Sequence, residues 1–97
     1  MRTLMKIQMD TEAGNQAIVD GSLPKILEET LTAIKAECAY FTSTDGMRTA
    51  YVVFDMQDSS QIPVIAEPLF QGLKARLDFS PVMNQDDLRK GLEQASR

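Results

Sequence analysis

The sequence predicts an α+β domain in which helices cover one face of an antiparallel sheet. Three observations support this fold class. Four segments alternate apolar and polar residues, two longer segments space their apolar residues at helical intervals, and Asp45-Gly46 separates two of the alternating segments. Alternation is typical of a strand with one buried face, whereas a spacing of three to four residues is typical of an amphipathic helix. The 97 residues, positions 1–97, are expected to form a single domain.

Eight segments follow from these patterns. The predicted strands are residues 3–9, 37–43, 48–56 and 76–83, and the predicted helices are residues 11–20, 23–36, 59–75 and a short one after Asn84. The boundary signals are Asp10 or Thr11 and Ser22 as N-caps, Gly21 as a left-handed helix end, and Asn84 with Asp87 as a capping pair. Leu88 and Leu92 are expected to dock the last helix.

Two local features define the connections further. Asp45-Gly46 predicts a tight type I′ hairpin, because that turn needs a positive φ at both central residues. The segment 59–75 carries Pro63 near its start and Pro68 in its interior. Its apolar spacing continues unbroken past Pro68, so we expect one helix that bends there, with Leu69 and Phe70 as its anchors.

The order of the main elements is strand, helix, strand, strand, helix, strand, helix. The simplest closed arrangement of this order is a ferredoxin-like βαββαβ domain: a four-stranded antiparallel sheet, two helices on one face, and an extra C-terminal helix. Right-handed crossovers determine which face the helices cover, and the first strand should lie between the third and the fourth.

The composition excludes several kinds of site. The chain has no histidine and one cysteine, Cys38. Histidine-dependent nucleophile pairs, histidine-bound metals and thiolate clusters within one chain are therefore excluded. Neither a GxGxxG nor a GxxxxGK phosphate loop is present. We expect no metal site and no cofactor.

The charge and the terminal sequence bear on partners and location. Ten Lys+Arg and fourteen Asp+Glu give a net charge of −4, with no basic stripe. We therefore expect neither a nucleic-acid partner nor attraction to an anionic membrane. The first ten residues mix charges among apolar residues, unlike a signal peptide, and no apolar run approaches the roughly 18 residues of a membrane span. With a single cysteine, a reducing, cytoplasmic location is expected.

The sheet face away from the predicted helices mixes apolar, aromatic and charged side chains. Its members are Leu4, Lys6, Gln8, Tyr40, Thr42, Tyr51, Val53, Asp55, Asp78, Ser80 and Val82. Two interpretations compete: the tyrosines lie flat on a solvated face, or a second copy packs its sheet against this one. We expect the second, a homodimer through this open sheet face, because a twofold needs only one self-complementary patch.

Candidate chemistry gathers on the same face. Lys6, Asp55 and Tyr51 are candidate catalytic residues, and the predicted strand order allows Lys6 to lie between the carboxylates of Asp55 and Asp78. The alternative is that these charges form a structural ion pair at the interface. Candidate ligand-binding residues are Tyr40, Asp78 and Gln8. The two tyrosines should be neighbours across the hairpin, where they could instead be interface packing. Glu67 falls off the apolar helix face, so we expect it to be solvated.

Four motifs carry a resemblance to known proteins: TEAGN…DGSLP, AYF…DGMRT, AEPLF and FSPVM. Over nearly the whole chain they resemble small bacterial proteins of similar length that have no assigned function. More broadly, the length, strand order and half-polar sheet face resemble the dimeric α/β-barrel superfamily of ferredoxin-like domains. That resemblance implies a barrel-forming homodimer. The superfamily includes cofactor-free monooxygenases, a lactone isomerase, haem-degrading enzymes and ligand-binding regulators. Its haem branch needs an axial histidine, which this chain lacks.

Three functions remain open at this point. The first is a homodimeric protein that binds a small molecule between sheet and helices or at the barrel mouth. The second is a cofactor-independent isomerase or monooxygenase acting on a small, partly apolar substrate, with Lys6, Asp55 or Tyr51 handling protons. The third is a structural or regulatory subunit without a ligand.

Overall fold

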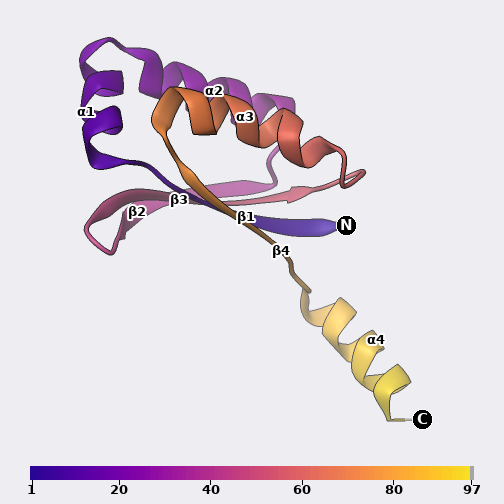
Figure 1. The fold of residues 1–97 in the computed structure, drawn as a ribbon. Coiled ribbons are helices and arrows are strands. Elements are labelled where there is room, and N and C mark those ends of the chain that lie inside the picture. The colour runs from indigo at the N-terminus through magenta and orange to yellow at the C-terminus, as the bar shows by residue number, and fades with distance from the viewer. Residues whose placement is uncertain (97) are drawn as a thin grey trace.

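The computed structural model describes residues 1–96, and Figure 1 shows a sheet with helices over one side and a last helix projecting from the other. The strands are β1 (Arg2–Gln8), β2 (Cys38–Thr44), β3 (Met47–Asp55) and β4 (Arg76–Pro81). The helices are α1 (Thr11–Val19), α2 (Ser22–Ala33), α3 (Gln61–Leu73) and α4 (Gln85–Ala95). The predicted α+β class is confirmed, since each predicted segment overlaps an element of the expected type.

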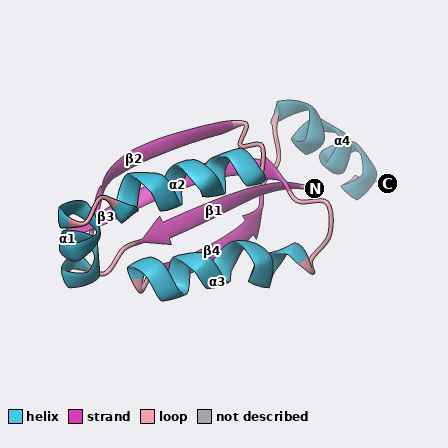
Figure 2. Cartoon of the chain, turned by 90° about the horizontal axis from the view of Figure 1, so that it is seen from above, coloured by secondary structure: helices cyan, strands magenta, loops and turns pink. Residues whose placement is uncertain are grey.

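The four strands form one open antiparallel sheet in the order β2-β3-β1-β4, so β1 lies between β3 and β4 as predicted. α2 and α3 run side by side over one face of the sheet, and α1 stands at one end (Figure 2). We call the other side the open face. It carries Leu4, Lys6, Gln8, Tyr40, Thr42, Thr49, Tyr51, Val53, Asp55, Asp78 and Ser80.

The turns and caps follow the local sequence signals closely. Asp45 and Gly46 have φ values of 56° and 75°, which confirms two positive φ angles in the hairpin. Asp10 caps α1 by accepting a hydrogen bond from the Ala13 N–H at 2.9 Å. The prediction for Ser22 was wrong by one residue, because Gly21, with a φ of 78°, is the N-cap and Ser22 begins α2.

The core lies between the sheet and the helices α2 and α3. Its largest fully buried side chains include Met5 and Ile7 of β1, Phe54 of β3 and Leu69 of α3. These residues occupy the inward positions that strand alternation and helical spacing predict. Phe41 shares that side of the sheet but is 57% exposed. It belongs to β2, an edge strand of the sheet.

Helix α3 continues through its internal proline. Pro68 lies inside α3 and is exposed, whereas Ile65 and Leu69 are buried against the core. One unbroken helix is therefore confirmed. Of the two predicted anchors, Leu69 is fully buried and Phe70 is 42% exposed. Pro68 cannot donate a hydrogen bond to the carbonyl four residues before it, so α3 carries a destabilising feature on its outer side.

Replacing Pro68 should therefore stabilise the domain. Pro68→Ala restores a helical N–H, and we expect the free energy of unfolding to rise by about 1–3 kcal/mol, allowing for the entropy that the unfolded chain regains. Pro63→Ala is the matched control, because Pro63 occupies the first turn, where no helical bond is lost. Urea denaturation of both variants measures the difference, and a destabilised Pro68→Ala protein would contradict it.

Helix α4 is well specified but does not pack on the domain. Asn84 and Asp87 form the predicted capping box, with the Asn84 side chain accepting from the Asp87 N–H at 2.8 Å. None of the helix residues is buried, and Leu88 and Leu92 are 45% and 60% exposed. The expectation that these leucines dock on the domain was wrong. Figure 1 shows α4 projecting away, on the opposite side of the sheet from α2 and α3.

Candidate functional site

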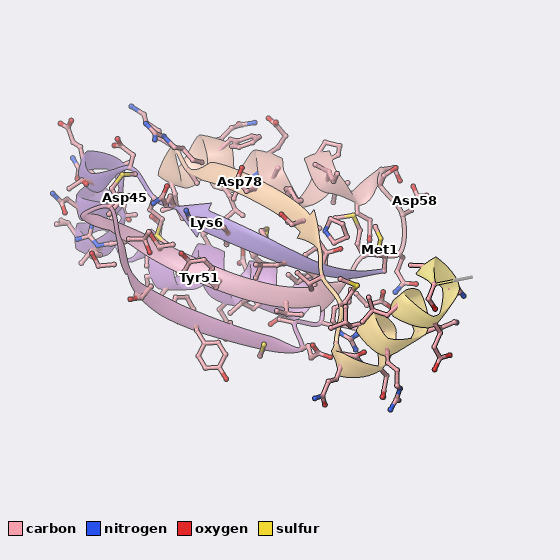
Figure 3. All side chains as sticks on the ribbon, turned by 90° about the horizontal axis from the view of Figure 1, so that it is seen from below. Met1, Lys6, Asp45, Tyr51, Asp58 and Asp78 are labelled. Carbon is pink, nitrogen blue, oxygen red and sulfur yellow. The ribbon has the colours of Figure 1, made fainter. Side chains whose placement is uncertain are left out.

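A row of four polar side chains crosses the middle of the open face. The strand register places Lys6 of β1 opposite Asp78 of β4 and Tyr51 of β3, and Tyr51 opposite Tyr40 of β2. We call these four residues the polar row. Figure 3, which views the open face, shows Lys6 lying between Tyr51 and Asp78. The predicted neighbourhood of the two tyrosines is therefore confirmed.

Lys6 is the central residue of the polar row. It is half-buried, and its neighbours along the open face of β1 are Leu4 and Gln8. Within residues 1–96 the Lys6 ammonium makes no hydrogen bond and no ion pair. A lysine carries three donors. A partly desolvated cation in the centre of a sheet face can therefore donate hydrogen bonds to an anionic or carbonyl oxygen from outside the chain.

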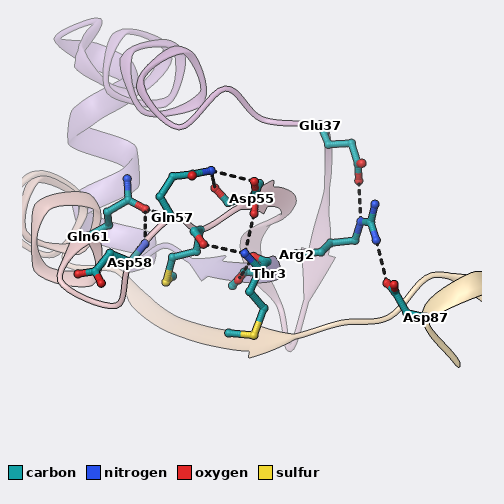
Figure 4. Close-up of polar contacts among 10 residues, drawn as sticks. Arg2, Thr3, Glu37, Asp55, Gln57, Asp58, Gln61 and Asp87 are labelled. Carbon is teal, nitrogen blue, oxygen red and sulfur yellow. Dashed lines mark hydrogen bonds and ion pairs between the residues drawn. The ribbon is translucent and has the colours of Figure 1, made fainter. Parts of the chain in front are cut away.

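Asp55 lies outside the polar row. Its register partner is Arg2, four positions along β1 from Lys6, so the prediction that Lys6 sits between Asp55 and Asp78 was wrong. Asp55 instead accepts hydrogen bonds from the Met1 ammonium at 2.6 Å and from the Gln57 amide at 2.8 Å (Figure 4). The ammonium has the largest effect and Gln57 the next, and together they lower the pKa of Asp55 below its ordinary value. A carboxylate with a lowered pKa is a weaker proton acceptor.

The side chains of Gln8 and Tyr51 are tied to the hairpin. The Tyr51 hydroxyl lies 3.2 Å from the Thr44 hydroxyl, and either group can donate. The Gln8 amide donates to the Thr44 carbonyl at 3.2 Å and to the Asp45 carboxylate at 3.4 Å. Gln8 is buried, and its donor is already occupied. The first contact orients Tyr51 within the polar row. The bonds of Gln8 connect β1 to the hairpin beside that row.

Two further candidates lie at the margins. Tyr40 is 70% exposed on the edge strand β2, so its ring has room to pack against a partner or a ligand. Glu67 is exposed on α3, where it accepts a hydrogen bond from the Gln71 amide at 3.1 Å. Its solvated position is as predicted, and it lies on a helix away from the open face.

An ionic cluster at the end of the sheet had no signal in the sequence. Arg2 lies 3.6 Å from the Glu37 carboxylate and donates to Asp87 at 3.0 Å (Figure 4). The three residues border a cleft of about 800 Å³ that Met83 and Asp55 also line. Arg2, Glu37 and Asp87 come from β1, the α2–β2 connection and α4, so only the tertiary fold brings them together.

A second concavity lies on the outer surface between α2 and α3. It has a volume of about 280 Å³ and is lined mainly by apolar side chains, among them Ile26, Ala33, Val64, Ile65 and Pro68. Periodicity alone does not predict it, because it depends on how the two helices are spaced. Within the described chain, no three Cys, Asp or Glu side chains come close enough together to hold a metal ion. No helix of residues 1–96 has the length and apolar character needed to span a membrane.

The protein is a small α+β domain with an open four-stranded antiparallel sheet, and the polar row lies on the open face of that sheet. Among solved structures, the chain is similar to one described as "De novo designed protein Ferredog-Diesel". The two share 13% sequence identity with a TM-score of 0.48, and the match covers 84% of this chain and 85% of that one. No protein-family model and no curated protein matches the sequence.

Proposed function

We propose that this chain is a ferredoxin-like domain that pairs through its open face with a second copy, forming a dimeric α/β barrel. The strand order and the placement of α2 and α3 on one face support the fold assignment. The open face supports the pairing, because it carries half-buried Leu4, Tyr51 and Val53 and none of the helices α1 to α3 covers it. Closed twofold dimers are the commonest protein oligomers, and they require one self-complementary patch.

The proposed function is binding of a small, partly apolar molecule between the two sheets. The observation that carries this proposal is Lys6, a half-buried cation without a hydrogen bond or ion pair in residues 1–96. Tyr51 and Leu4 beside it would supply aromatic and aliphatic contact, and Tyr40 on the edge strand β2 would border the site. A ligand with an apolar body and one anionic or carbonyl oxygen matches this arrangement.

Titration with anilinonaphthalene sulfonate, a fluorescent aromatic anion, tests the proposal. The wild-type protein should enhance its fluorescence, and Lys6→Met should weaken its binding about tenfold, the worth of one charge-assisted hydrogen bond. Lys25→Met is the matched control, because Lys25 is exposed on α2, away from the open face. Equal affinities for the two variants would place the dye elsewhere and contradict a site at Lys6.

A cofactor-independent enzyme is the second candidate. The observation that favours it is the position of Lys6 between a carboxylate, Asp78, and a phenol, Tyr51, which are groups able to exchange protons. Asp55 takes no part in this version, since its carboxylate is engaged at the end of the sheet. The two candidates differ in the fate of the ligand: recovery of an unchanged ligand favours binding, and recovery of an isomerised or oxygenated one favours the enzyme.

A further inference from the structure

Helix α4 carries an apolar stripe that nothing in the described chain covers. Leu88 and Leu92 are one helical turn apart and therefore share a face, with Ala95 one further turn along. Lys90 and Glu93 lie on the opposite, charged side of the helix. Among the hydrogen bonds and ion pairs of residues 1–96, the one that joins α4 to the sheet is the pair that Asp87 makes with Arg2 at 3.0 Å.

An isolated helix of this size has little stability of its own. α4 is 11 residues long, and helices shorter than about 12–15 residues are marginal in water unless an apolar face packs against something. The capping box nevertheless specifies where the helix begins. The projection also makes the chain extended, with a radius of gyration of 15.3 Å against roughly 12–13 Å for a compact chain of this length. The sequence therefore encodes a helix whose apolar stripe must pack against a partner surface to be stable.

The position of α4 points to the second copy as that partner. α4 projects on the open-face side of the sheet, which is the side where the second copy is proposed to lie (Figure 1). Packed sheets lie about 10 Å apart, and an 11-residue helix is about 16 Å long. The arm is therefore longer than the gap between two facing sheets, so it reaches alongside the other copy.

The size of the open face gives an independent reason for such an arm. Four strands about 4.8 Å apart and about seven residues long cover a flat footprint on the order of 450 Å². A stable interface buries about 800 Å² of accessible surface on each partner. Even with the added relief of its side chains, a sheet face of this size supplies a modest interface, and the exposed stripe of α4 would enlarge it.

We propose that α4 is an exchanged arm: in the dimer, Leu88 and Leu92 of each copy pack against the other copy and clasp it. This inference rests on the proposed dimer and extends it, because it assigns part of the interface to the C-terminal helix. It also explains why a helix with a complete capping box has no residue buried against its own domain. Packing of Leu88 and Leu92 against the other copy would also hold α4 beside the cleft that Arg2 and Met83 line.

The first test compares two double variants by sedimentation equilibrium. Leu88→Ser with Leu92→Ser removes the stripe, and Lys90→Ser with Glu93→Ser makes equal changes to helix propensity on the charged side. We expect the first pair to weaken dimerisation at least tenfold and the control pair to leave it within about twofold. Equal dimer affinities for the two pairs would overturn the arm while leaving the dimer itself intact.

Hydrogen exchange of the α4 amides is the second test, and it separates failure of the arm from failure of the dimer. In the wild-type dimer these amides should exchange at least tenfold more slowly than in a monomeric variant such as Val53→Asp. Protection that persists in the monomer would show α4 folded back onto its own domain, which overturns the inference. A wild-type protein that is itself a monomer would instead overturn the proposed dimer.

Discussion

Val53→Asp should convert the protein from a dimer to a monomer without unfolding it. Val53 lies on the open face in the C-terminal half of β3, directly opposite Leu4 of β1 and Cys38 of β2. In a monomer an aspartate there reaches water, because Val53 is only half-buried. In a sheet-to-sheet dimer the carboxylate and its symmetry mate would be buried without partners. We expect the dissociation constant to rise by about 100-fold or more, which is roughly 3 kcal/mol.

A matched variant makes this result specific to the open face. Val64→Asp introduces the same change on the outer surface of α3, where Val64 is 73% exposed. It should leave the dimer affinity unchanged when the two proteins are compared by light scattering over a dilution series. If Val64→Asp dissociated the dimer and Val53→Asp did not, the groove between α2 and α3 would be the interface in place of the open face.

Phe54→Ala should produce the largest loss of stability. Phe54 is 1% exposed and is the largest of the fully buried side chains, lying on β3 in the core cluster with Met5, Leu69 and Leu73. Truncating a buried phenylalanine removes its transfer free energy and leaves a cavity, so the free energy of unfolding should fall by about 3–5 kcal/mol. For a domain of this size such a loss leaves little residual stability.

The control for this variant is Phe70→Ala on α3. Phe70 is 42% exposed, so its truncation should cost about 1 kcal/mol or less. Both variants must be unfolded by urea at one fixed protein concentration, because dimer formation adds to the apparent stability. Equal losses at the two positions would mean that the core does not lie between the sheet and the helices as described.

The sequence predicted the elements and faces of this fold because those features are encoded locally. Asp45-Gly46 determines the hairpin turn, and the turn sets the register that places Tyr40 opposite Tyr51. Alternation along β1 separates Met5 and Ile7 from Lys6 without any knowledge of the tertiary structure. The error at Ser22 was one residue, because the neighbouring Gly21 takes the cap position. Phe41 lies on the inward side of the sheet but is exposed, because β2 is an edge strand.

The candidate site was predicted less completely, since alternation gives the face of a residue but not its position along the sheet. Lys6 and Asp55 share the open face, yet four positions along β3, or roughly 13 Å, separate Asp55 from the register partner of Lys6. Only the pairing of β1 with β3, two strands far apart in sequence, determines that offset. Likewise, the periodicity of Leu88 and Leu92 showed an apolar stripe without showing what packs on it.

The mass of the wild-type protein in solution tests the central claim most directly. Light scattering at micromolar concentration should give twice the 10.8 kDa of one chain, and the mass should fall toward a single chain in Val53→Asp. A wild-type mass of one chain at micromolar concentration would contradict the pairing of open faces. The proposed site between two sheets and the exchanged arm of α4 would then both have to be abandoned.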